Sequence, residues 1–123
     1  WQDWTDPTTG TSERFDGKKS NDPSIDSTYY KDLNEAAVMT EYMPAAGQIT
    51  LAYRVDENTA WTTIFTNSTD NSISHVATNI ESSGAALPKD YREIEFRILS
   101  TGNAEVTGLR FKEEVRGIKH TAD

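Results

Sequence analysis

Side chains that could carry acid–base or nucleophilic chemistry are few in this chain. It has two histidines, His75 and His120, and no cysteine among 123 residues. A catalytic serine needs a positioned histidine base, and the Gly-x-Ser-x-Gly turn that often presents such a serine does not occur in the sequence. Glu93 and Glu95 would place two carboxylates on one strand face, roughly 6–7 Å apart, a spacing found in glycosidases. Arg97 continues that row, so we interpret it as a solvated face, interpret His75 as an ordinary strand residue, and expect no enzyme.

Metal ligands are equally sparse. Two histidines without cysteine cannot complete the usual zinc sets, and calcium needs six to eight oxygen ligands. Some of those oxygens could come from two groups of residues: Asp22, Asp26 and Asp32, or Asn67, Asp70 and Asn71. Neither group has the spacing of a calcium loop with its distal glutamate, and Asp and Asn commonly form turns by bonding their own backbone. We therefore expect no cofactor, with a structural calcium as the alternative.

Aromatic residues supply the candidates for ligand binding. Trp61 begins a strand next to the polar loop that contains Asp56 and Asn58. Its ring could stack on a sugar there while the side chains of Asp56 and Asn58 bond sugar hydroxyls. The alternative interpretation is that Trp61 packs into the core, as large aromatic residues commonly do.

Strands with an alternating pattern must position these residues. Gln48–Val55 places Ile49, Leu51, Tyr53 and Val55 on one face, and residues 92–99 place Ile94, Phe96 and Ile98 inward. This period of two indicates half-buried antiparallel strands. Residues 60–67 form the returning strand of a hairpin after residues 56–59, and residues 37–43 and 72–80 are weaker strand candidates. Six to eight short strands predict an all-β antiparallel sandwich, of jelly-roll or immunoglobulin-like type.

The last strand changes phase at Gly108. Val106 is on the even phase, whereas Leu109 and Phe111 are on the odd phase. Such a slip reverses the faces unless a bulge absorbs it, and glycine in the first bulge position is a common means. We therefore predict a β-bulge at or beside Gly108. Residues 100–103 (STGN) predict a hairpin turn between the two flanking strands.

Composition divides the chain into three parts. Residues 1–26 are rich in turn formers and are predicted to be an extended arm or linker that docks through Trp1, Trp4 and Phe15. Residues 27–116 form the predicted sandwich, and residues 117–123 a C-terminal exit segment. Because the sequence starts at Trp1 and ends without a capped element, we expect it to be a piece of a longer chain.

Charge excludes some partners. The chain carries 12 Lys and Arg against 20 Asp and Glu, a net charge of −8. Without a basic stripe, phosphate neutralisation cannot drive tight binding to nucleic acid, and an anionic membrane surface is disfavoured for the same reason. The apolar runs are too short to span a bilayer. We expect neither a nucleic-acid nor a membrane partner.

Two paired segments resemble a known class of domains. Residues 49–56 (ITLAYRVD) are followed by 59–64 (TAWTTI), and residues 91–98 (YREIEFRI) by 104–111 (AEVTGLRF). Both pairs resemble non-catalytic β-sandwich domains of tailed-phage virion proteins, found near tail, adaptor and host-adhesion components. The resemblance implies a structural domain in the virion that binds other virion proteins through its sandwich surface and its arm, and that could form a homo-oligomer. The alternative is a carbohydrate-binding module for a host-surface glycan, and a glycosidase or lyase fragment is the least favoured hypothesis.

Overall fold

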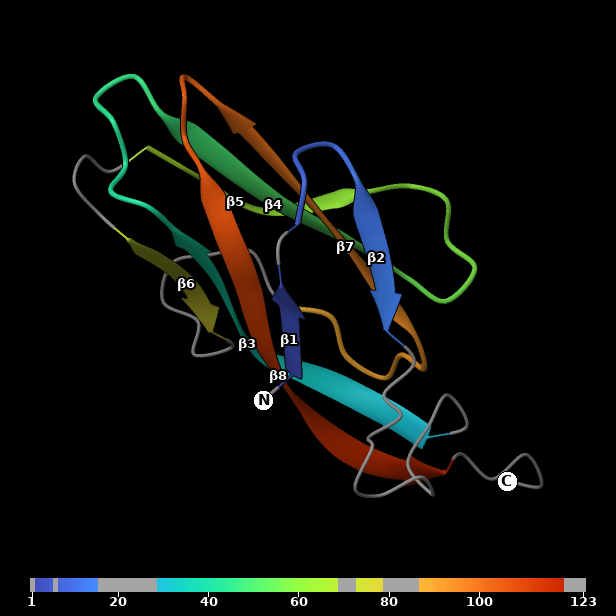
Figure 1. The fold of residues 1–123 in the computed structure, drawn as a ribbon. Coiled ribbons are helices and arrows are strands. Elements are labelled where there is room, and N and C mark those ends of the chain that lie inside the picture. The colour runs from blue at the N-terminus through green and yellow to red at the C-terminus, as the bar shows by residue number, and fades with distance from the viewer. Residues whose placement is uncertain (1, 6, 16–28, 69–72, 79–86, 119–123) are drawn as a thin grey trace.

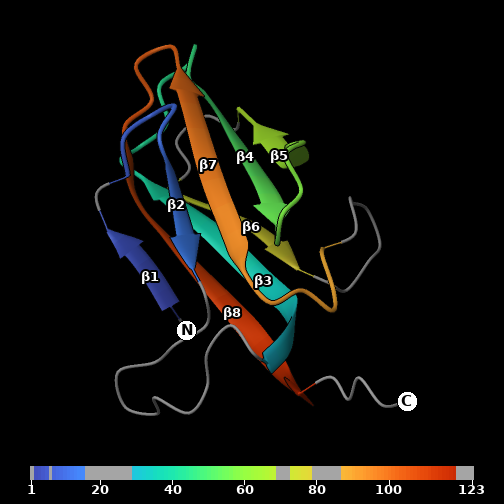
Figure 2. The same cartoon turned by 90° about the vertical axis from the view of Figure 1, so that its right-hand side faces the viewer.

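The protein is an all-β chain of two antiparallel four-stranded sheets in the computed structural model (Figure 1), which describes residues 2–5, 7–15, 29–68, 73–78 and 87–118. Sheet A has the strand order β1-β8-β3-β6, and sheet B the order β2-β7-β4-β5 (Figure 2). The strands are β1 (Gln2–Thr5), β2 (Ser12–Phe15), β3 (Tyr29–Thr40), β4 (Gln48–Val55), β5 (Thr62–Asn67), β6 (Ser74–Thr78), β7 (Ile94–Thr101) and β8 (Val106–Ile118). Within these ranges the chain has no helix that could cross a lipid bilayer.

The core lies between the two sheets and follows the alternation in the sequence. Ile94, Phe96 and Ile98 of β7 are completely buried, as are Ile49 and Leu51 of β4. Further along β4, Tyr53 and Val55 are partly buried and pack against this core. The predicted inward faces of both strands are confirmed, because a strand that pairs on both edges presents alternate residues to the opposing sheet.

The predicted arm is instead part of both sheets where the structure describes it. β1 pairs with β8, and β2 pairs with β7. Trp4 packs against the core, and the Phe15 ring centroid lies 4.8 Å from that of Phe111. The expectation of an arm over residues 1–26 is therefore corrected for residues 2–5 and 12–15. Strands of four residues are too short to show an alternating pattern, and their hydrogen-bond partners lie far away in sequence. Trp1 and residues 16–26 lie outside the described residues.

The predicted bulge in β8 is confirmed. Met39 lies opposite Gly108 while Thr40 lies opposite Val106, so Thr107 is the additional residue. Only Gly10 and Gly102 among the described glycines have positive φ. The bulge thus restores the inward phase of Leu109 and Phe111, both buried, without a left-handed glycine at 108.

The predicted turn between β7 and β8 is present, but the predicted pairing across it is wrong. Gly102 and Asn103 have φ values of 64° and 66°, and the N–H of Ala104 donates to the carbonyl of Thr101 at 3.3 Å. Positive φ at both central residues is typical of a tight type I′ turn. However, β7 belongs to sheet B and β8 to sheet A. The turn chemistry is local, whereas the choice of sheet is made by distant strands.

The predicted hairpin between β4 and β5 is confirmed. The two strands pair from Ile49 opposite Asn67 to Tyr53 opposite Thr62. The returning strand begins at Thr62, two residues later than predicted. As a result Trp61 belongs to the end of the loop, next to the outer face of sheet B.

Candidate functional site

The outer face of sheet B carries a row of charged residues from three neighbouring strands. Arg14 of β2 lies opposite Glu95 of β7, which in turn lies opposite Arg54 of β4. Arg97, two residues beyond Glu95 on β7, lies opposite Ala52. Side chains directly opposite each other on one face are close enough to interact. We refer to Arg14, Arg54, Trp61, Glu95 and Arg97 as the arginine–tryptophan cluster.

Glu95 is the centre of this cluster and is only 7% exposed. Its Oε1 accepts hydrogen bonds from Arg14 Nη2 at 2.9 Å and from Arg54 Nε at 2.8 Å, and its Oε2 accepts one from the Ser12 hydroxyl. The hydrogen bond from Arg54 lowers the pKa of Glu95 below its usual value, although burial acts in the opposite direction. The prediction of a solvated carboxylate row is therefore wrong for Glu95, because β2 and β4 place a guanidinium on each side of it.

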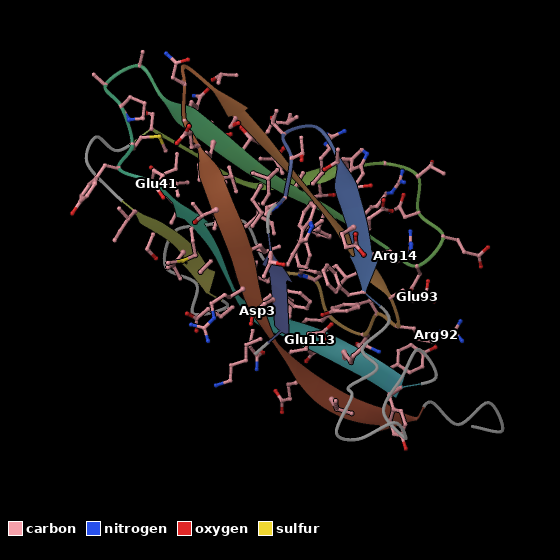
Figure 3. The ribbon with its side chains drawn as sticks, in the orientation of Figure 1. Asp3, Arg14, Glu41, Arg92, Glu93 and Glu113 are labelled. Atoms are coloured by element: carbon pink, nitrogen blue, oxygen red, sulfur yellow. The ribbon has the colours of Figure 1, made fainter. Side chains whose placement is uncertain are left out.

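Glu93 is more exposed than Glu95 and contributes less to the cluster. Its Oε1 lies 3.2 Å from Arg14 Nη1, with 38% of its side chain exposed. Arg14 and Glu93 lie close together near the end of β2 (Figure 3). Both carboxylates thus bind the same arginine, and this arrangement stabilises the sheet face by charge-assisted hydrogen bonds.

Trp61 is half-buried on this face and does not belong to the buried core. The guanidinium carbons of Arg54 and Arg97 lie 4.5 and 4.4 Å from its ring centroid, which is within cation–π range. Ala52, which points outward between the two arginines, is only 2% exposed. Trp61 therefore lies outside the core, and two arginine side chains lie against the ring that was predicted to stack on a sugar.

Asp56 and Asn58 use one side-chain oxygen each to hold the chain's own backbone. Asp56 has a left-handed backbone, with φ of 51°, and its Oδ1 accepts hydrogen bonds from the N–H groups of Arg92 and Glu93, both at 2.9 Å. Asn58 Oδ1 accepts from the N–H of Ala60 at 3.0 Å. These bonds fix the loop that carries Trp61. The structure brings the three predicted ligand residues to one end of sheet B, with two of them in turn-forming roles.

Lys31 and Tyr91 carry buried polar groups that were not candidates in the sequence. Lys31 and Tyr91 are each 1% exposed. Lys31 Nζ donates to the carbonyl of Tyr29 at 2.9 Å, and the Tyr91 hydroxyl donates to Glu113 at 2.6 Å. Burial, followed by the charge of Glu113, raises the pKa of Tyr91. The burial of Lys31 was indicated in the sequence only by its position two residues before Leu33, which places both side chains on the same face of a strand.

His75 is buried at the sheet A edge, with 1% exposure. Its Nε2 lies 3.2 Å from the Thr40 hydroxyl, and desolvation lowers its pKa. This placement suits a structural strand residue. His120 lies outside the described residues.

The candidate calcium ligands are only partly within the described chain. Asp32 Oδ1 accepts a hydrogen bond from the N–H of Asp90 at 2.9 Å, which is a structural use of that oxygen. Asp22, Asp26, Asp70 and Asn71 lie outside the described ranges. Among the described residues, no group of three or more His, Asp or Glu side chains lies close enough together to hold a metal ion.

The convergence of the three arginines of the cluster was not predicted from the sequence, although Arg97 was placed in the Glu93–Glu95 row. Arg14 lies in the segment predicted to be an arm, and Arg54 and Arg97 occupy outward positions of well-predicted strands. Their alternation with core residues was visible, but their convergence depends on strand pairing. Comparison with protein-family models, with curated proteins and with solved structures finds no match to this chain.

Proposed function

We propose that this chain is a non-catalytic structural and assembly module of a virion, built as a jelly-roll sandwich. The strand orders β1-β8-β3-β6 and β2-β7-β4-β5 support the jelly roll, which has eight strands in two sheets; the immunoglobulin type has seven or nine. Viral capsid domains and lectins both use this architecture. Because fold alone does not define function, the proposal depends on the surface.

The observation that carries the proposal is the difference between the two long sides of the sandwich. The edge strands β5 (TTIFTN) and β6 (SHVAT) contain no charged residue. The opposite edge strands, β1 (QDWT) and β2 (SERF), carry Asp3, Glu13 and Arg14. Proteins commonly protect sheet edges with charges, and an unprotected edge accepts a strand from a partner. The β5 and β6 edges are therefore the proposed assembly surface.

The expected assembly role of the arm applied to Trp4 and Phe15 and to Trp1, which lies outside the described residues. Trp4 and Phe15 pack against the chain's own core, so we do not include them in the proposed interface. Binding to other virion proteins is assigned to the β5 and β6 side instead. The net charge of −8 argues against nucleic acid or an anionic membrane as the partner.

Hydrogen exchange tests the assembly role. Amides of β5 and β6 should exchange about tenfold or more slowly in the assembled particle than in the isolated chain, because a partner strand would add hydrogen bonds along their outer edges. The amides of β1 and β2 serve as the control and should change little. Equal exchange of β5 and β6 in both states, or protection confined to β1 and β2, would contradict the proposal.

A second candidate function is glycan binding at the outer face of sheet B. It is favoured by the half-buried position of Trp61 outside the core, at the end of the loop that contains Asp56 and Asn58. In a glycan array, Trp61→Ala should abolish binding with the fold intact by circular dichroism. Tyr42→Ala, which removes an aromatic side chain that is 71% exposed, is the matched control. Unchanged binding by Trp61→Ala would exclude this site.

A further inference from the structure

Exposed apolar side chains gather at the β6 edge of sheet A. Tyr42, Ile73 and Val76 are 71%, 46% and 50% exposed. The N–H of Thr40 donates to the carbonyl of Ile73 at 3.1 Å, which places the residues following β3 next to those preceding β6. Of the large hydrophobic residues that are exposed in the described chain, only Leu99 lies elsewhere, on β7 of sheet B. We refer to Tyr42, Ile73 and Val76 as the β6 patch.

The β6 strand is held in a fixed register along one edge, and no other described strand pairs with its second edge. Among the described residues it pairs only with β3, from Glu35 opposite Thr78 to Met39 opposite Ser74, without a register shift. His75 points inward, where it is buried and bonded to Thr40. Val76 therefore points outward, next to the small side chain of Ala37. A strand that has a fixed register, and an edge with which no described strand pairs, can accept a further strand by β-augmentation.

We propose that β6 pairs antiparallel with β6 of a second copy, about a two-fold axis at Val76. In this register Val76 meets its counterpart, Ser74 meets Thr78, and His75 meets Ala77, so a strand without charges meets itself. An isologous contact must be self-complementary in this way. The proposal rests on the assembly function above and names its partner as a second copy of the chain.

If two copies associate, charge favours contact through the β6 edge over contact through other parts of the surface. Each copy carries a net charge of −8, so approach through most of the surface is opposed by repulsion. Pairing through an uncharged strand keeps the acidic side chains apart. Since the remaining repulsion is screened by salt, association should become stronger as ionic strength rises.

β5 is also uncharged but offers less to a partner copy. Its Ile64 is buried and its Phe65 packs against the core, while Thr62, Thr63 and Thr66 are the exposed residues. A partner strand at β5 would gain backbone hydrogen bonds but little apolar contact. At β6 it would gain both, because Val76 and the adjacent Ile73 and Tyr42 are exposed.

Analytical ultracentrifugation of the full chain tests the proposal. The wild-type chain should show a concentration-dependent monomer–dimer equilibrium, shifted toward dimer by added salt. Val76→Lys places a charge at the proposed axis and should raise the dimer dissociation constant by about tenfold or more. Thr66→Lys, at an exposed position of β5, is the matched control and should leave the constant unchanged. Ser74→Lys, also exposed on β6, should repeat the effect of Val76→Lys, with folding of each variant checked by circular dichroism.

Two outcomes would overturn self-pairing at β6. One is a wild-type chain that stays monomeric at all concentrations and salt levels. The other is a dimer that Val76→Lys and Thr66→Lys weaken equally. A monomeric chain whose β5 and β6 amides are still protected in the particle would mean that a different protein pairs with this edge, so the assembly function would stand without self-pairing.

Discussion

At the scale of single residues, Glu95 shows how neighbours on other strands decide the state of a side chain. Two arginines and a serine donate to its carboxylate, and it is almost completely buried. In the sequence it is one of two glutamates that alternate with core residues. Its lowered pKa follows from hydrogen bonds that come from residues 41 and 81 positions away.

Replacing Glu95 with Gln should destabilise the fold in a pH-dependent way. At about pH 7 the loss should be about 1–3 kcal/mol of unfolding free energy, because charge-assisted hydrogen bonds to Arg14 and Arg54 are lost. A folded-state pKa below the ordinary value of 4.5 means that the carboxylate stabilises the fold above that value and ceases to do so as the pH falls through the lowered folded pKa. Urea unfolding at several pH values measures this.

Glu93→Gln is the control for that experiment, since among the described residues its carboxylate binds Arg14 alone and its side chain is 38% exposed. It should cost less than Glu95→Gln at neutral pH. Equal losses for the two variants, or a Glu95→Gln deficit that persists in acid, would show that the cluster does not hold Glu95 as described.

The backbone conformation at position 102 requires glycine. Gly102 has φ of 64°, and a Cβ there would overlap the carbonyl oxygen of Ala46. Gly102→Ala should therefore lower the unfolding free energy by about 2 kcal/mol or more, from left-handed strain together with steric overlap. Gly10 has φ of 81°, and a Cβ there would meet no atom within 4 Å, so Gly10→Ala should cost only the strain, about 1 kcal/mol. Thermal or urea unfolding that ranks the two in the opposite order would contradict this account.

At the scale of elements, β2 is one of two strands that lie in the segment predicted to be an extended arm. Three of its four side chains are exposed, and the fourth, Phe15, is partly buried. The Phe15 ring joins those of Phe96 and Phe111, at centroid distances of 6.2 and 4.8 Å. One aromatic residue thus anchors a strand that is otherwise held by its pairing with β7.

Phe15→Ala should lower the unfolding free energy by about 3 kcal/mol, because it leaves a cavity beside two buried rings. Glu13→Ala, at an exposed position of the same strand, should stay within about 0.5 kcal/mol of wild type. Chemical denaturation measures both. If Phe15→Ala were as mild as Glu13→Ala, the segment would behave as the loosely attached arm that composition suggested.

At the scale of the whole molecule, the buried His75 links the stability of the sandwich to pH. It lies on β6 opposite Val38 of β3, within hydrogen-bond distance of Thr40, and its pKa is lowered from the ordinary value of 6.5 by desolvation. The unfolded chain therefore binds a proton at a higher pH than the folded chain does. Stability is complete well above 6.5 and falls as the pH drops below it, until the folded pKa is reached.

His75→Gln should flatten this dependence, because glutamine can keep a hydrogen bond to Thr40 without titrating. Between about pH 7.5 and about pH 5.5 the wild type should lose more stability than the variant. Thermal unfolding across that range measures the two slopes. Parallel slopes would show that His75 is not the group responsible.

The sequence determined the features that depend on neighbouring residues. Alternation gave the all-β class and the inward positions of Ile94, Phe96 and Ile98, and a change of phase located the bulge beside Gly108. The tight turn at Gly102 and Asn103 was also predictable. Periodicity and turn chemistry act over a few residues and are therefore visible in one chain.

Apart from the β4–β5 hairpin, only the tertiary structure decided which strands pair. It separated β7 and β8 into different sheets, recruited β1 and β2 into them, and brought Arg14 and Arg54 to Glu95. Each of these outcomes depends on pairing between segments that are far apart in sequence and carry no local mark of their partner. That pairing buries Glu95, places the arginines against Trp61 and leaves β6 at the edge of sheet A. The surface of this protein could therefore not be derived from its sequence pattern alone.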